Sequence, residues 1–215
     1  MKLINYWVFR ELSGIFESLI RNIGGSIGRK IRYSYYKRRF ESCGSNVIIE
    51  EGVFFQNPNF MTFGSNIWID KNSILIAGPF DNSKRKFKVK GDIKIPFGNL
   101  ILSDGIHIAP FSLIQSHGGV FIGRNVTIAS GSKIYTLSHH YRNLDDKSDL
   151  KRYCFSSMAP VEDQYLIVGN VVFEDFSALG INSVILPGAI IPTGTWVGVL
   201  MSLSKPLEES NSIFK

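Results

Sequence analysis

Only two cysteines occur in the 215 residues, Cys43 and Cys154, and they lie far apart without a CxxC pattern. This spacing excludes a disulfide framework and a zinc ribbon, and it fits a reducing compartment. The chain also lacks an uninterrupted apolar run of about 20 residues, the length of a membrane-spanning helix, and it shows no secretory signal. We therefore expect a cytoplasmic protein of globular composition, since 44% of its residues are apolar.

Positive charge is not spread evenly along the chain. Residues 1–40 hold nine Lys and Arg against Glu11 and Glu17, a balance of +7, whereas the net charge of the whole chain is +6. The remaining residues therefore sum to −1. A uniformly basic nucleic-acid binder would not show this distribution, so we expect no nucleic-acid partner and a special role for the N-terminal segment.

Residues 1–42 are expected to form an amphipathic, basic helical segment. Apolar residues recur there at helical spacing and are interrupted by charged residues at 10, 11, 17 and 21. These apolar positions are Leu3, Trp7, Phe9, Leu12, Ile15, Phe16, Leu19, Ile20 and Ile23. Two roles stay open and can coexist. The helix could cap the end of the domain, or, with the following RKIRYSYYKRRF, it could lie on the anionic inner face of a cell membrane.

A period of six residues governs much of the remaining chain. From Ile167 the sequence reads IVGNVV, FEDFSA, LGINSV, ILPGAI, IPTGTW and VGVLMS, followed by Leu203. Each hexad opens with a large apolar residue, its fifth residue is mostly small, and Gly and Asn gather at its third and fourth positions. The same register appears upstream in LSDGIH and IGRNVT, and more faintly in FGSNIW. An amphipathic helix has a period of 3.6 and a half-buried strand a period of two, so neither explains this pattern.

Six residues suffice for a short strand and a corner, and three such faces close a coil. The opening residue is expected to point inward onto its equivalent in the next coil, while Gly or Asn supplies the positive φ angles of the corners. Stacked coils bury a continuous apolar column. The sequence therefore predicts an all-β domain, a parallel β-helix over residues 43–205, followed by a short tail of residues 206–215.

Two segments interrupt the repeat. Residues 77–95 lose the period and carry six Lys and Arg. The interval from Ile134 to Ile167 is 33 residues, which is one hexad plus 27 additional residues. A β-helix accommodates such a segment by looping it out at a corner, and long loops in compact domains usually carry function. We expect an extruded loop over about residues 139–166.

The start of this loop carries a family resemblance. The stretch IYTLSHHYR resembles the IYT-x-T-H-P segment of the hexapeptide-repeat acetyltransferases, above all the maltose, galactoside and polysaccharide O-acetyltransferases. LGINSVILPGAIIPTGTWVGVLMSLSK is similar to their C-terminal repeats. The resemblance covers roughly residues 43–205. It implies a left-handed β-helix, a homotrimer, and His139 as the general base, with His140 in place of the proline.

Several neighbouring residues could support this base. Histidine is suited to take a proton from an attacking hydroxyl or amine, because its ordinary pKa is about 6.5. A main-chain N–H of a neighbouring coil or a glycine-rich corner could stabilise the oxyanion. The residues expected near the acceptor or behind the base are His140, His117, Tyr135, Ser138 and Asp145. Asp146, Glu162 and Asp163 are further candidates for a carboxylate that orients the imidazole. The first interpretation of His117 is a His-Gly-Gly corner that needs the flexibility of glycine, and the second is a residue that faces the same groove as His139.

The resemblance also implies acetyl-CoA as the acyl donor, bound in a groove between two subunits beside the C-terminal coils. The matching positions are Gly180, Ile181, Val199, Ser204 and Lys205. Val199, Leu200 and Met201 are bulkier than the family's Ala-Gly-Ser, and the family's proline-rich tail is missing. No metal is expected.

We expect an acetyl-CoA-dependent O-acetyltransferase acting on a sugar hydroxyl in the synthesis of capsule, O-antigen or exopolysaccharide. The alternative is N-acetylation of an amino sugar or nucleotide sugar, whose common version carries a GxGxxG unit that residues 1–60 lack. Two further classes stay open. One is a γ-type carbonic anhydrase, although no HxxxxH pair occurs, and the other is a β-helix that binds without catalysis.

Overall fold

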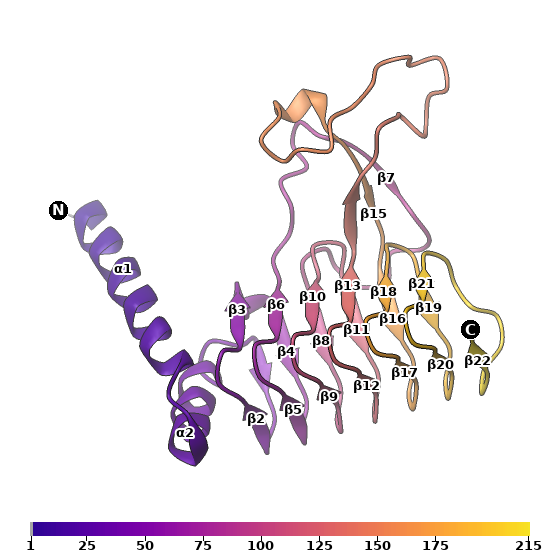
Figure 1. Cartoon of the computed structure of the whole chain (residues 1–215). Helices are drawn as coiled ribbons and strands as arrows, with labels where there is room; N and C mark the ends of the chain where they lie inside the picture. Colours follow the sequence, from indigo (N-terminus) through magenta and orange to yellow (C-terminus); the bar gives the residue numbers. More distant parts are fainter. Residues whose placement is uncertain (1) are drawn as a thin grey trace.

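The computed structural model describes residues 2–215, and side chains from residue 12 onward. Two helices, α1 (Lys2–Arg21) and α2 (Gly25–Tyr36), precede a long stack of short strands (Figure 1). Two 3-10 turns, Pro58–Phe60 and Val161–Asp163, complete the regular elements. In the described residues no helix is long and apolar enough to cross a membrane.

Three parallel sheets form the faces of the stack. The first sheet consists of β1 (Ser42–Cys43), β4 (Met61–Phe63), β8 (Leu100–Leu102), β11 (Val120–Ile122), β16 (Val171–Phe173) and β19 (Ile190–Ile191). The second consists of β2 (Val47–Ile49), β5 (Ile67–Ile69), β9 (His107–Ile108), β12 (Thr127–Ile128), β17 (Ala178–Leu179), β20 (Trp196–Val197) and β22 (Ile213–Phe214). The third consists of β3 (Phe54–Gln56), β6 (Ile74–Ile76), β10 (Leu113–Gln115), β13 (Lys133–Tyr135), β18 (Val184–Ile185) and β21 (Ser202–Leu203). Because the chain visits the three sheets in turn, the predicted parallel β-helix is confirmed.

The interior follows the period of six. The hexad-opening residues from Phe173 to Leu203 are at most 2% exposed, and they form the apolar column. The small fifth residues are buried beside them, and their hydroxyls are satisfied: Ser183 donates to the Gly198 carbonyl at 2.7 Å. Asn182 adopts a left-handed φ of 55° at a corner, as expected from its place in the hexad.

The start of the repeat is one correction to the sequence prediction. Ile167 opens the first predicted hexad, but it lies in β15 (Tyr165–Val168), which pairs with strands outside the coil. The coil resumes at Val171, whose strand β16 pairs with β11. Apolar residues at the same spacing occur on both sides of this junction, so the pattern alone does not show where the loop ends.

The chain end also differs from the prediction. Residues 206–215 were expected to form a tail outside the helix, yet β22 within them pairs in parallel with β20. Ile213 and Phe214 therefore add a seventh strand to the second sheet.

At the other end, α2 covers the first coil. The Arg32 guanidinium is fully buried and donates to the carbonyls of Ile49, at 2.9 Å, and Ile20, also at 2.9 Å. The ring of Tyr36 packs on Phe55 at 4.6 Å between centroids. This is the predicted cap, whereas α1 extends away from the coil (Figure 1).

The described part of α1 keeps an apolar row in solvent. Leu12, Ile15 and Leu19 are each about 60% exposed, at spacings that place them on one side of the helix. The side chains of Leu3, Trp7 and Phe9, which belong to the same predicted pattern, lie outside the described residues.

The two interruptions of the repeat leave the coil at the same corner. Residues 77–99 follow β6 and residues 136–170 follow β13, and both of these strands belong to the third sheet. Strand β7 (Lys86–Val89) from the first insertion pairs in parallel with β15 from the second, and β15 pairs antiparallel with β14 (Leu137–His139). The two insertions thus form one small sheet that projects from the side of the coil (Figure 1).

Candidate active site

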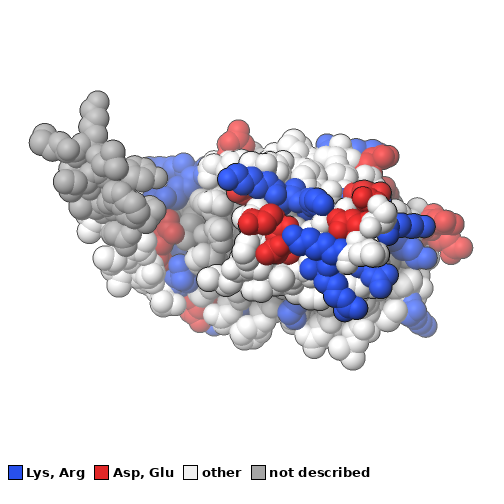
Figure 2. Space-filling model, turned by 90° about the horizontal axis from the view of Figure 1, so that it is seen from above, with Lys and Arg blue, Asp and Glu red and all other residues white. Residues whose placement is uncertain are grey.

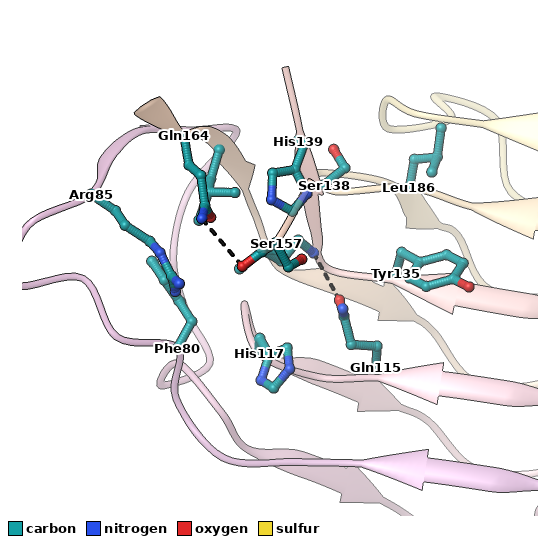
Figure 3. Close-up of a pocket in the computed structure, with 12 residues that line it drawn as sticks. Phe80, Arg85, Gln115, His117, Tyr135, Ser138, His139, Ser157, Gln164 and Leu186 are labelled. Atoms are coloured by element: carbon teal, nitrogen blue, oxygen red, sulfur yellow. Dashed lines mark hydrogen bonds between the residues drawn. The ribbon is translucent and has the colours of Figure 1, made fainter. Parts of the chain in front are cut away.

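A cavity of about 600 Å³ lies where the two insertions meet the coil (Figure 3). Residues from both insertions and from corners of three coils form its wall. They are Phe80, Arg85, Gln115, His117, Tyr135, Leu137, Ser138, His139, Ser157, Gln164, Leu166 and Leu186. Of the predicted site residues, His117, Tyr135, Ser138 and His139 are therefore brought together in one place.

His139 ends strand β14 at the base of the second insertion. Its pairing with Leu166 in β15 holds the backbone, so the imidazole is positioned by a sheet and not by a free loop. The Nε2 atom is shielded from solvent and has no hydrogen-bond partner among the described residues. An unpaired buried nitrogen costs free energy, and a ligand group in the cavity would relieve that cost.

His117 lies across the cavity, on the short corner between β10 and β11. Its Nδ1 is 2.7 Å from the Gly78 carbonyl of the first insertion. Because a carbonyl can only accept, Nδ1 carries the proton, and in the neutral ring Nε2 is then free to accept one. The imidazole is thus oriented by a backbone group, as a base in a catalytic pair often is.

The glycines beside His117 have a structural explanation. Gly119 has a φ of 90°, and a side chain at Gly118 would meet the Thr136 carbonyl at 2.5 Å. Their N–H groups are already used, since Gly118 donates to the Thr136 hydroxyl at 2.7 Å and Gly119 to the Ser116 carbonyl at 2.8 Å. The glycine corner therefore offers no free N–H for an oxyanion.

Four polar or charged residues of the wall were not predicted. Gln115 accepts from the Leu137 N–H at 3.2 Å, while Gln164 is buried and donates to the Ala159 carbonyl at 2.6 Å. Arg85 and Ser157 come from the two insertions. Gln115 occupies the coil position equivalent to Tyr135, one coil earlier, so its register could have revealed it. The other three lie in segments without a period.

His140 and Asp145, which were expected near the acceptor or behind the base, lie outside the cavity wall. The Nδ1 of His140 is 2.9 Å from the Arg142 carbonyl, outside the cavity wall. Asp145 accepts from Lys88 at 2.7 Å and from the Tyr165 hydroxyl at 2.9 Å, and these two contacts hold the pKa of its carboxyl below the ordinary value. Neither side chain lines the cavity, because His140 is bonded within the loop and Asp145 is bonded to Lys88 of β7 and to Tyr165.

The other predicted carboxylates do not orient His139 either. Asp146 accepts from Ser148 at 2.6 Å, and Asp163 pairs with Lys151 at 2.6 Å. None of the described residues that line the cavity is Asp or Glu, so Glu162 does not line it either.

Charged side chains instead pair with one another on the outer surface of the insertions. Asp149 accepts from Tyr153 at 2.7 Å, Asn143 at 3.0 Å and Lys86 at 3.2 Å. These hydrogen bonds, that of Tyr153 above all, hold the pKa of Asp149 far below its ordinary value. Figure 2 shows Lys and Arg side chains gathered beside Asp and Glu side chains on the face seen from above.

No protein-family model matches the chain. A curated relative, the dTDP-4-amino-4,6-dideoxy-D-glucose acyltransferase of Escherichia coli, is 25% identical over 169 residues, which are 79% of this chain and 74% of the relative. The chain is an acyltransferase that resembles the hexapeptide-repeat family. The resemblance and the enzyme class expected from the sequence are thus confirmed.

Solved structures agree with this acyltransferase in fold. AntD, an N-acyltransferase from Bacillus cereus in complex with dTDP and 3-hydroxybutyryl-CoA, matches with a TM-score of 0.60 at 22% identity, covering 83% of this chain and 80% of AntD. A hexapeptide-repeat acetyltransferase from Vibrio cholerae, VCA0836, matches with a TM-score of 0.50 at 14% identity, covering 94% and 82%. The AntD complex contains an acyl-CoA, the class of donor that the sequence predicts.

Three of the predicted CoA positions of the acyltransferase, Gly180, Ile181 and Val199, lie along a different corner, between the second and third sheets, whereas Ser204 and Lys205 follow β21 of the third sheet. A side chain at Gly180 would meet the Gly198 carbonyl carbon at 2.5 Å, so stacking of coils alone requires this glycine. Ile181 and Val199 are about half exposed and lie on successive coils. Ser204 uses its carbonyl to accept from Lys90, and Lys205 is exposed beyond it.

Proposed function

We propose that this enzyme transfers an acyl group from acyl-CoA to the amino group of a nucleoside-diphosphate amino sugar. The cavity supports a base-assisted transfer, because His139, whose buried Nε2 has no partner among the described residues, lines it and no described lining residue is a carboxylate. The curated relative acts on dTDP-4-amino-4,6-dideoxy-D-glucose, and a structure of AntD holds that sugar nucleotide and CoA. These findings favour the amino-sugar alternative over the sugar hydroxyl expected first.

The chemistry then assigns His139 one task. The amine nitrogen attacks the thioester carbonyl carbon, the new C–N bond forms, and the C–S bond breaks. His139 accepts the proton that the amine loses, and this proton passes to the departing CoA sulfur. Tyr135 and Ser138 supply hydroxyl groups on the same wall that can hold the sugar.

The donor side of the proposal uses the ledge of Ile181 and Val199, together with Lys205. An apolar ledge suits the pantetheine arm, and the ammonium group of Lys205, which follows β21, suits a phosphate. In this proposal the coil is left-handed, as in the family that the sequence resembles, and three copies form the enzyme. Exposed Phe111 and Leu200, at 66% and 74%, lie on the same edge as Ile181 and supply apolar surface for a second copy.

The row of Leu12, Ile15 and Leu19 supports peripheral attachment to a membrane. The row is exposed, and the surrounding segment of residues 1–40 carries +7. An apolar row within a basic segment binds anionic lipid surfaces.

A thiol-release assay tests the activity. Purified protein is mixed with acetyl-CoA or 3-hydroxybutyryl-CoA and dTDP-4-amino-4,6-dideoxyglucose, and free CoA thiol is measured. We expect release that depends on the amino sugar. Release that is equal with the 4-hydroxy analogue would contradict the amine as acceptor, and its absence with every acyl-CoA would contradict the function.

A further inference from the structure

Arg85 is distinguished by its place on the cavity wall. Among the described lining residues it is the one with a permanent charge, and it faces a wall without Asp or Glu. Figure 3 shows Arg85 on one side of the cavity and Leu186 on the other, with His139 and His117 between them.

Three neighbouring lysines of the same segment have hydrogen-bond partners for their side chains, whereas Arg85 forms no ion pair among the described residues. Lys86 pairs with Asp149, Lys88 with Asp145, and Lys90 donates to the Ser204 carbonyl. Arg85 makes one weak bond, from Nη1 to the Asp81 carbonyl at 3.3 Å. Its Nε is shielded from solvent and has no hydrogen-bond partner among the described residues.

Among the described residues, the Asp81 carboxylate forms no ion pair with the Arg85 guanidinium. This carboxylate accepts from the Ser83 hydroxyl at 2.7 Å and from the Ser83 N–H at 3.0 Å. The segment itself is held in place, because Phe80 packs on Phe87 at 5.3 Å and on Phe97 at 5.7 Å. Arg85 is therefore presented to the cavity from a fixed segment with most of its donors unused.

Unused guanidinium donors call for an anionic acceptor. A guanidinium presents N–H groups in a planar fork that matches the oxygens of a phosphate, and a buried N–H left without an acceptor is costly. We propose that Arg85 binds the diphosphate of the sugar-nucleotide acceptor, while the sugar reaches His139. This assignment rests on the proposed function for the identity of the ligand.

CoA also contains a diphosphate, so it is the other ligand that Arg85 can bind. Leu186 begins the wall on the side of the C-terminal coils, and the donor ledge of Ile181 and Val199 belongs to those coils. Arg85 lies on the other side of His139 (Figure 3). This order places the acceptor diphosphate, and not that of CoA, on Arg85.

Calorimetric binding of dTDP and of CoA to the full chain tests the site without requiring turnover. We expect Arg85→Ala to weaken dTDP binding about 10-fold to 100-fold, since a hydrogen bond to a charged group contributes that much, and to leave CoA binding unchanged. Arg85→Lys should restore part of the affinity. Lys84→Ala is the matched control, because it removes the same charge from the adjacent exposed residue and should change neither affinity.

Three results would overturn the assignment: unchanged dTDP binding in Arg85→Ala, loss of CoA binding in place of dTDP binding, or no dTDP binding by the native chain. Equal melting temperatures of the variants show that the fold is intact. If dTDP binding depends on Arg85 but no amino sugar is acylated, the subsite stands and the proposed function fails. The two ideas are thus tested separately.

Discussion

The two imidazoles of the cavity differ in how they are held. His117 is oriented by the Gly78 carbonyl, whereas His139 depends on the backbone pairing of β14 and leaves Nε2 without a partner. In our proposal the base is His139 and not His117, because a buried nitrogen without a partner can bind a group of the substrate.

Replacement of His139 tests this assignment. We expect His139→Ala to lower kcat/KM by about 100-fold to 10,000-fold, the usual contribution of a general base. His139→Asn keeps the approximate size of the side chain and should show the same loss. Steady-state kinetics and melting curves provide the measurement.

A different outcome would assign the base to His117, on the other side of the cavity. If His139→Ala keeps native activity while His117→Ala loses it, His117 is the base. The melting temperature distinguishes this result from unfolding of the corner.

Sequence reasoning reached the residues that belong to the repeat or border it. His139 follows a recognisable segment directly after a coil strand, and the opening residues of the hexads could be assigned inward from their spacing alone. Arg85, Ser157 and Gln164 could not be found, because the insertions have no period that would tell which side chains face the coil. Ile167 shows the converse error, since it fits the period but pairs within the insertion.

At the scale of elements, the two insertions form a single small sheet. Strands β7, β14 and β15 come from both insertions, and the cavity exists because they pair. The ion pairs of Lys86 and Lys88 join β7 to the second insertion from the outside.

At acid pH, the sheet formed by the two insertions should open before the coil unfolds. The folded pKa of Asp149 is depressed, so its stabilising effect is complete above its ordinary pKa of about 3.9 and is lost as the pH falls toward the lower folded value. We expect the amides of residues 137–168 to lose protection from hydrogen exchange below about pH 4, while those of the coil keep it. Asp149→Asn should show the same local opening at neutral pH, and equal protection of both regions at every pH would contradict the account.

The N-terminal helix makes a separate prediction. With vesicles that contain anionic lipid, the native chain should co-sediment, and replacement of Leu12, Ile15 and Leu19 by Ser should abolish this binding because the exposed row supplies the apolar contact. Ser replacements on the coil-facing side would disturb packing, so exposed Lys30→Ser in α2 serves as the control and should weaken binding only slightly. Equal sedimentation of native chain and triple variant would exclude the helix as the attachment site.

For the whole molecule, the coil acts as a scaffold that places an active site at one corner. Its architecture was predictable because a period of six has few structural solutions, and the buried column from Phe173 to Leu203 follows it without exception. The pairing between distant insertions depends on three-dimensional contacts that no local pattern encodes.

At the scale of the whole molecule, we predict that three copies of the chain assemble into a trimer. Sedimentation equilibrium should give three times the chain mass of 24.1 kDa, since exposed apolar residues line one edge of the coil. Phe111→Asp and Leu200→Asp together should produce monomers with reduced activity. A native monomer at micromolar concentration would remove the intersubunit groove from the proposal.

The nature of the acylated atom tests the central claim most directly. The reaction product with a dTDP-amino sugar and acyl-CoA is treated with hydroxylamine, which cleaves oxygen esters and leaves amides intact, and its mass is measured before and after. We predict one added acyl group that survives the treatment. Loss of the acyl group would show that the enzyme acylates a hydroxyl, and it would contradict the account.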